Sequence, residues 1–161
     1  MSAILERIYR ELSYMKFLFI FIISVFLMKP FAYAELLLPK DITVYKNPDC
    51  GCCNDWIKYL RKHKYNVTTI STRKVHSEKA RLRVPPEVSA CHTAVIGNYV
   101  VEGHVTHRDI TRLLLFQPDV IGIAVPGMPI GTPGMERGDT VVPYEVKSFD
   151  KEGNIKTFVK H

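Results

Sequence analysis

Residues 41–60 have the sequence DITVYKNPDCGCCNDWIKYL, and this stretch decides the fold that we predict for the chain. Residues 41–45 form a compact β-type run, and turn-forming Asn, Pro and Asp residues follow it. A helix is expected from near Cys52 to about His63, because apolar residues recur there at helical spacing. These apolar residues are Trp56, Ile57 and Leu60. The stretch therefore predicts a strand, a turn and a helix that begins at a cluster of cysteines.

The segments after this stretch extend the same α/β pattern. We expect a strand at 66–70, a helix at 74–83, a hairpin of strands at 93–96 and 99–102, and a helix at 106–116. The resulting order β-α-β-α-β-β-α predicts a sheet with a parallel pair and a terminal hairpin, covered by helices. This is the thioredoxin-like order, so we expect an α/β fold with a mixed sheet flanked by helices.

Two further segments follow the thioredoxin-like order. Residues 119–138 are rich in Gly and Pro, and we expect a loop there. Residues 144–149 and 155–159 are β-type runs that flank a turn at 151–154, which predicts a second hairpin. The domain is therefore expected to carry an added C-terminal loop and β-hairpin.

The N-terminal segment has the pattern of an export signal. Lys16 precedes a short apolar run over residues 17–28, and Ala32-Tyr33-Ala34 follows it. A positive residue, a short apolar run and an A-x-A motif are typical of a signal peptide that is cleaved after the motif. The run is short for a helix that spans a membrane, which needs about 20 apolar residues.

This pattern divides the chain into a signal peptide, residues 1–34, and a domain, residues 35–161. Met15 is an alternative start, because residues 1–14 are unlike the usual beginning of a signal peptide. A retained N-terminal anchor is the alternative interpretation of the apolar run. Both interpretations place the domain outside the cytoplasm, and we expect the periplasm of a bacterium.

Composition is that of an ordinary globular protein. The chain has 161 residues, of which 47% are hydrophobic and 24% are charged. Without residues 1–34 it carries 18 basic and 14 acidic residues, an excess too small and too scattered to indicate nucleic-acid binding. We expect no nucleic-acid partner, and a membrane contact only through the signal segment.

The spacing of the cysteines indicates either a redox site or a metal site. Cys50 and Cys53 have C-x-x-C spacing after a strand and at the start of a helix, which is the context of redox motifs. A helix N-terminus stabilises a thiolate, and thiolates act both as nucleophiles and as metal ligands. The spacing alone therefore leaves open a thiol–disulfide oxidoreductase that uses Cys50 and Cys53.

Two features favour a metal. Cys52 adds a third thiol inside the motif, whereas a disulfide catalyst needs one attacking and one resolving thiol. Cys91 and His92 stand where the third strand opens, and a thioredoxin-like fold brings that position against the redox motif. A set of thiolates with an imidazole suits Cu(I) or Zn(II).

Structural disulfides are the alternative for four cysteines in an oxidising compartment. Cys52 and Cys53 would then pair with different partners, such as Cys50 and Cys91, because a bridge between Cys50 and Cys52 closes a strained ring. In that case the chain would be a binding module whose fold is held together by two disulfides. It would bind a partner through the Gly/Pro-rich segment, residues 119–138.

Two further side chains are candidate ligands. His104 lies at a strand end that can aim it toward the cysteines, and Met128 stands in a Gly/Pro loop. A thioether is a soft ligand that selects Cu(I). The alternatives are that His104 is a polar residue at the end of a hairpin and that Met128 is an apolar plug over the core. For His107 we prefer the interpretation as a polar residue at the hairpin end.

Four motifs, in order, resemble the DUF411 family of CopG-like copper-resistance proteins over about residues 41–160. These motifs occupy residues 44–56, 90–95, 101–105 and 124–129. The resemblance implies a periplasmic copper-resistance protein whose thioredoxin-like domain carries a cysteine-rich copper cluster. It implies Cys50, Cys53 and Cys91 as the main thiolate ligands. Supporting candidates are Cys52, His92 and His104, with Met128 as a weaker one.

The resemblance also bears on cofactor, activity and partners. It implies copper, as one or several Cu(I) ions. Zinc stays the alternative metal because the set of thiolates and imidazole also suits it. Redox activity would make the protein a copper or thiol oxidoreductase. Other periplasmic copper-handling proteins are the expected partners besides the copper ions themselves.

Overall fold

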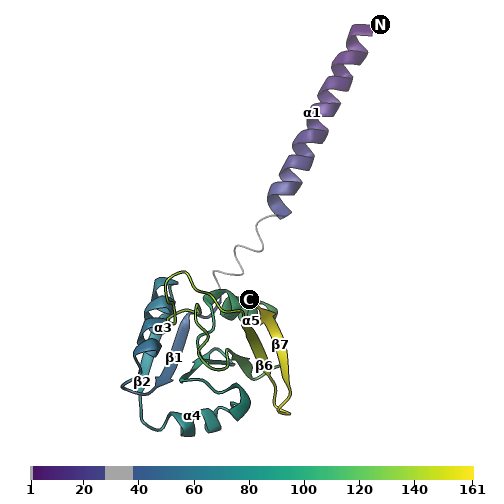
Figure 1. Cartoon of the computed structure of the whole chain (residues 1–161). Helices are drawn as coiled ribbons and strands as arrows, with labels where there is room; N and C mark the ends of the chain where they lie inside the picture. Colours follow the sequence, from purple (N-terminus) through teal and green to yellow (C-terminus); the bar gives the residue numbers. More distant parts are fainter. Residues whose placement is uncertain (1, 28–37) are drawn as a thin grey trace. The chain divides into compact units, whose positions relative to one another are not determined.

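The computed structural model describes residues 2–27 and 38–161, and the chain divides into two units after residue 37. The first unit contains the helix α1 (Ser2–Leu27), and the second contains the sheet and its helices (Figure 1). Within the described residues, the helices are too short or too polar for a membrane span. The Ala32-Tyr33-Ala34 motif lies outside the described residues, so the cleavage site stays a prediction.

A seven-stranded mixed sheet, in the order β2-β1-β3-β4-β5-β6-β7, organises the second unit. Its strands are β1 (Asp41–Lys46), β2 (Asn66–Ser71), β3 (His92–Ile96), β4 (Tyr99–Glu102), β5 (Gly122–Ala124), β6 (Glu145–Phe149) and β7 (Ile155–Lys160). β1 pairs in parallel with β2 and antiparallel with β3, and β3 and β4 form the expected antiparallel hairpin. The predicted mixed sheet is thus confirmed.

The helical segments follow the expected order. They are α3 (Gly51–Lys62), α4 (Val75–Arg81) and α5 (His107–Phe116); the 3-10 turn η1 (Pro86–Val88), between α4 and β3, was not predicted. α3 begins directly after Cys50, whose Sγ accepts the Cys53 N–H at 3.3 Å. Thr106 caps α5 in the same way, by accepting the Asp109 N–H. These caps explain why the helices begin where the sequence predicts, within two residues.

The core lies on both faces of the sheet. Adjacent residues of β4 and of β5 enter different apolar clusters, because successive side chains of a strand point to opposite faces. One cluster joins the strands to α3 and α5 through Trp56, Ile57, Leu60, Ile110 and Leu113, among others. The other joins Val100, Ala124 and Phe149 to Val84 and Val88, in the segment after α4. The apolar residues expected on one face of α3 are all buried.

β5 corrects the expectation of a continuous loop over residues 119–138. Gly122–Ala124 pairs in parallel with β4 and antiparallel with β6. A Cβ atom at Gly122 would lie 2.1 Å from the carbonyl oxygen of Val100, so this close strand approach requires glycine. The second hairpin, β6 and β7, is therefore joined to the thioredoxin-like strands in one sheet.

Candidate metal centre

The start of α3 carries one disulfide and one free thiol. Cys50 and Cys53 are joined by the disulfide, whereas Cys52 and Cys91 are free. The C-x-x-C pair is therefore in its oxidised form here. This arrangement differs from the alternative in which two disulfides link all four cysteines.

The four sulfur atoms are gathered at this helix start. Cys52 Sγ lies 3.6 Å from Cys50 Sγ and 4.0 Å from Cys91 Sγ. All four sulfurs lie within 4.8 Å of one another. The fold thus brings Cys91, from the opening of β3, against the motif at the start of α3.

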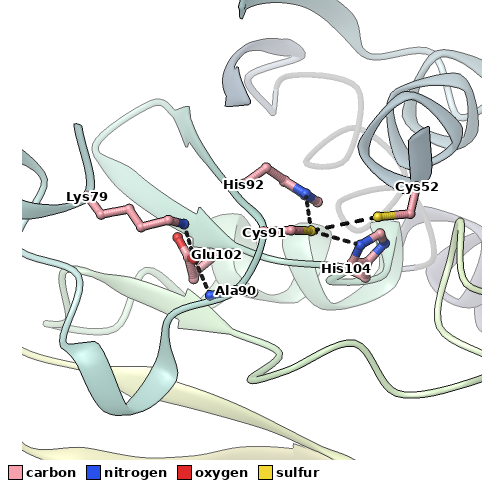
Figure 2. A network of polar contacts seen from close by, with 7 residues as sticks. All are labelled: Cys52, Lys79, Ala90, Cys91, His92, Glu102 and His104. Atoms are coloured by element: carbon pink, nitrogen blue, oxygen red, sulfur yellow. Dashed lines mark hydrogen bonds and ion pairs between the residues drawn. The ribbon is translucent and has the colours of Figure 1, made fainter. Parts of the chain in front are cut away.

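Two imidazoles adjoin the same cluster through Cys91 (Figure 2). Cys91 Sγ lies 3.3 Å from His92 Nδ1 and 3.3 Å from His104 Nε2. His104 Nδ1 lies 2.7 Å from the carbonyl oxygen of Pro133. A carbonyl only accepts hydrogen bonds, so His104 Nδ1 carries the proton and the lone pair of Nε2 faces Cys91. His104 thus turns an unprotonated nitrogen toward the cluster, and this nitrogen can bind a metal ion.

Burial determines the protonation states around Cys91. It raises the pKa of the Cys91 thiol to about 12, and the neighbouring Cys52 acts in the same direction. It also lowers the pKa of His104 and holds that of His92 well below its ordinary value. At neutral pH the centre therefore contains a neutral Cys91 thiol and two neutral imidazoles. A metal ion that binds Cys91 must displace its proton.

Gly103 sets the close packing around Cys91 and His104. Its φ is +72°, and a Cβ atom there would lie 2.7 Å both from Ala90 Cβ and from the carbonyl oxygen of Val125. Its N–H also donates to the carbonyl oxygen of His92 at 3.1 Å. Glycine at this position therefore lets the end of β4 lie directly against the residues that flank Cys91.

The Gly/Pro segment after β5 packs over the start of α3. A Cβ atom at Gly134 would lie 2.7 Å from the backbone nitrogen of Trp56 and 3.0 Å from the carbonyl oxygen of Cys52. The neighbouring Pro133 supplies the carbonyl that orients His104. The Trp56 ring in turn lies 4.4 Å from that of His92. This segment therefore contributes backbone groups to the centre.

Met128, in the same segment, is 51% exposed and does not pack as a plug over the core. In the part of the chain that the structure describes, no hydrogen bond joins its thioether to the cysteines. Its role as a ligand stays a prediction. His107, interpreted as a polar residue at the end of the hairpin, begins α5 and stacks on His63 with ring centroids 3.6 Å apart.

Comparisons with known proteins identify the family to which the chain belongs. A family model described as a protein of unknown function, DUF411, matches residues 88–135. Two solved structures of copper resistance protein CopG, Form 1 and Form 2, are each 40% identical to this chain with a TM-score of 0.72. Each match covers 76% of this chain and 98% of the CopG chain. The chain belongs to the DUF411 family. A comparison with curated proteins found no match.

The donor set of this DUF411 protein fits copper binding. Thiolate sulfur is a soft ligand that suits Cu(I), and imidazole nitrogen suits both copper and zinc. The structure contains two overlapping groups of such donors, the four cysteines and the trio of Cys91, His92 and His104. Cys91 belongs to both groups, so it is the donor that connects sulfur and nitrogen ligands.

A buried ion pair adjoins the centre and is absent from the sequence-based expectations. Lys79 of α4 pairs with Glu102 at the end of β4, and their side chains are 6% and 0% exposed. Glu102 Oε1 also accepts the Ala90 N–H at 2.6 Å. Burial raises the pKa of Glu102, and the Lys79 ammonium opposes this rise. The sequence contains no signal for this pair, because its partners are 23 residues apart in different elements.

Proposed function

We propose that this protein binds copper as Cu(I) through Cys50, Cys52, Cys53 and Cys91 and serves in copper resistance. The observation that supports this most strongly is the convergence of four sulfurs within 4.8 Å of one another. His92 and His104 contribute imidazole nitrogens at the Cys91 side. The 40% identity to copper resistance protein CopG supports copper over zinc as the metal.

Full occupancy of this centre requires reduction of the disulfide. Adding two electrons and two protons converts Cys50 and Cys53 to thiols, and Cu(I) then replaces the protons on four sulfurs. A thiolate can bridge two metal ions, so four neighbouring thiolates suit a cluster of several Cu(I) ions. Binding by several thiolates in this way would keep Cu(I) from radical-generating chemistry.

A thiol–disulfide oxidoreductase is the second candidate, favoured by the Cys50–Cys53 disulfide at a helix start. Oxidation of the two thiols to the disulfide releases two electrons and two protons. Those electrons can reduce two Cu(II) ions to Cu(I), so copper binding and redox activity are compatible in one centre. A reductase activity that is lost in Cys50→Ser and kept in Cys91→Ser supports this second function.

We also propose that the domain works in the periplasm, where its partners are other copper-handling proteins. The A-x-A motif after a short apolar run supports export and cleavage after Ala34. N-terminal sequencing of the protein from a periplasmic extract tests this, with Glu35 as the expected first residue. A protein that retains residues 1–34 in the membrane fraction contradicts cleavage.

Anaerobic titration of the reduced full chain with Cu(I), in competition with a chromogenic chelator, tests copper binding. We expect tight binding that the double substitution Cys50→Ser and Cys91→Ser removes. His76→Ala is the matched control, because His76 is an exposed imidazole on α4. Negligible binding by the unmodified protein, or binding that survives the double substitution, overturns the proposal.

A further inference from the structure

The ion pair of Lys79 and Glu102 is unusual among the ion pairs of residues 2–27 and 38–161, because both of its side chains are buried. Removing two charges from water is costly, and apolar side chains of similar volume are often equally stable in such a position. A contribution to the stability of the fold is therefore not enough to explain why this ion pair is present. Its surroundings suggest another role.

The Glu102 carboxylate holds the residue that precedes Cys91 (Figure 2). Its Oε1 accepts hydrogen bonds from the Lys79 ammonium and from the Ala90 backbone N–H. The next residue, Gly103, donates its N–H to the carbonyl oxygen of His92 at 3.1 Å. The end of β4 therefore forms hydrogen bonds with the residues on both sides of Cys91.

These two hydrogen bonds are important because Cys91 itself lies outside any helix or strand. Residues 89–91 follow η1 and precede β3, so strand pairing begins only at His92. In the described structure Cys91 Sγ nevertheless lies 4.0 Å from Cys52 Sγ and 3.3 Å from His104 Nε2. A side chain on a loop keeps such a position only if neighbouring groups hold its backbone.

We propose that Glu102 is a positioning residue, oriented by Lys79, whose carboxylate holds the Ala90 amide and thereby keeps Cys91 within reach of Cys52 and His104. The proposal rests on the proposed function in one respect, the role of Cys91 as a copper ligand. The positioning itself does not depend on the metal, because every contact that carries it is formed without one.

Two double variants isolate this role. Lys79→Met with Glu102→Gln removes both charges but keeps an amide oxygen that accepts the Ala90 N–H. Lys79→Met with Glu102→Leu removes both charges and the acceptor at nearly the same volume. Neither variant leaves a buried unpaired charge, so the comparison reports on the hydrogen bond to Ala90.

The first readout is cross-linking of the two free thiols with dibromobimane in the protein that keeps its Cys50–Cys53 disulfide. This reagent fluoresces strongly only after each of its two arms has alkylated a thiol. The rate at which fluorescence rises therefore reports how often Cys52 and Cys91 lie close enough to be linked. The second readout is Cu(I) affinity of the reduced protein by chelator competition. Both use the full chain, and circular dichroism compares the folding of the two variants.

We expect the Leu variant to cross-link at least about tenfold more slowly than the unmodified protein, and the Gln variant to be within about threefold of it. Cu(I) affinity should show the same order. Equal cross-linking rates in the two variants overturn the proposal. If no protein binds Cu(I) but the difference in cross-linking persists, the proposed function fails and the positioning role stands.

Ala90→Pro gives an independent test if the Leu variant fails to fold. It deletes the donor N–H and leaves the Lys79–Glu102 pair intact. Ser89 has φ −66° and ψ 138°, an extended conformation that suits a residue before proline. We expect slower cross-linking of Cys52 and Cys91 in this variant as well, and an unchanged rate contradicts the proposal.

Discussion

Cys91 Sγ lies 3.3 Å from His104 Nε2, and this contact joins a thiol before β3 to an imidazole after β4. Cys91 is also the donor shared by the four-cysteine group and by the group with two histidines. A substitution at His104 therefore tests whether the nitrogen side of the centre takes part in binding copper.

His104→Asn should weaken Cu(I) binding by about tenfold, since an asparagine amide can still donate to the Pro133 carbonyl but does not reach Cys91. Chelator competition with the reduced protein measures this change. His76→Asn, at an exposed imidazole, is the control. Unchanged affinity in His104→Asn would show that copper is held by sulfur alone.

Alkylation of Cys91 should depend on pH up to unusually high values. The thiolate is the reactive form, and burial with the neighbouring Cys52 raises the pKa of Cys91 to about 12. Because the neutral thiol dominates below that pKa, the rate should rise about tenfold per pH unit through the neutral and mildly alkaline range. Iodoacetamide labelling of the metal-free protein, followed by peptide mass spectrometry, gives the rate. A plateau near the ordinary thiol pKa of 9.0 contradicts this prediction.

The oxidation state of Cys50 and Cys53 should control how much copper the protein holds. With the disulfide formed, only Cys52 and Cys91 offer thiols in the described residues. The oxidised protein is therefore expected to bind fewer Cu(I) ions per chain than the reduced protein. Elemental analysis after desalting of both forms measures the ratio, and equal ratios would mean that the disulfide sulfurs are not needed as ligands.

Gly134→Ala should lower the free energy of unfolding by about 1–3 kcal/mol more than Gly127→Ala. Both glycines have positive φ, +83° and +69°, so the backbone cost of alanine is similar. A Cβ atom at Gly134 meets the Trp56 nitrogen at 2.7 Å, whereas one at Gly127 meets nothing within 4 Å. Urea unfolding followed by fluorescence of Trp56, the single tryptophan, compares them. Equal stabilities would contradict close packing of Gly134 on α3.

The strands and α-helices from β1 to α5 were predictable because local signals define each of them, whereas the short turn η1 was not predicted. The apolar face of α3 repeats at helical spacing, and Pro118 marks the end of α5. β5 was not predictable in the same way. It is three residues long, includes a glycine, and is held by β4 and β6 on its two sides rather than by its own propensity.

The candidate centre likewise has some features that the sequence predicts and others that it does not. The clustering of Cys50, Cys52 and Cys53 is visible in the sequence, and the thioredoxin-like order explains the approach of Cys91. The Pro133 carbonyl that orients His104 is a backbone group 29 residues away, and any residue type can supply such a group. The hold of Glu102 on Ala90 likewise depends on the folded path of the chain.

The side chains of the candidate centre differ in how deeply they are buried. Cys50, Cys52 and Cys91 are partly exposed, whereas Cys53, His92 and His104 are fully buried. If the centre binds copper as proposed, an ion that arrives from solvent would meet the sulfur of Cys52 or Cys91 before the imidazole nitrogens. The two imidazoles lie deeper than these thiols, so the order in which the ligands bind would follow from their depth alone.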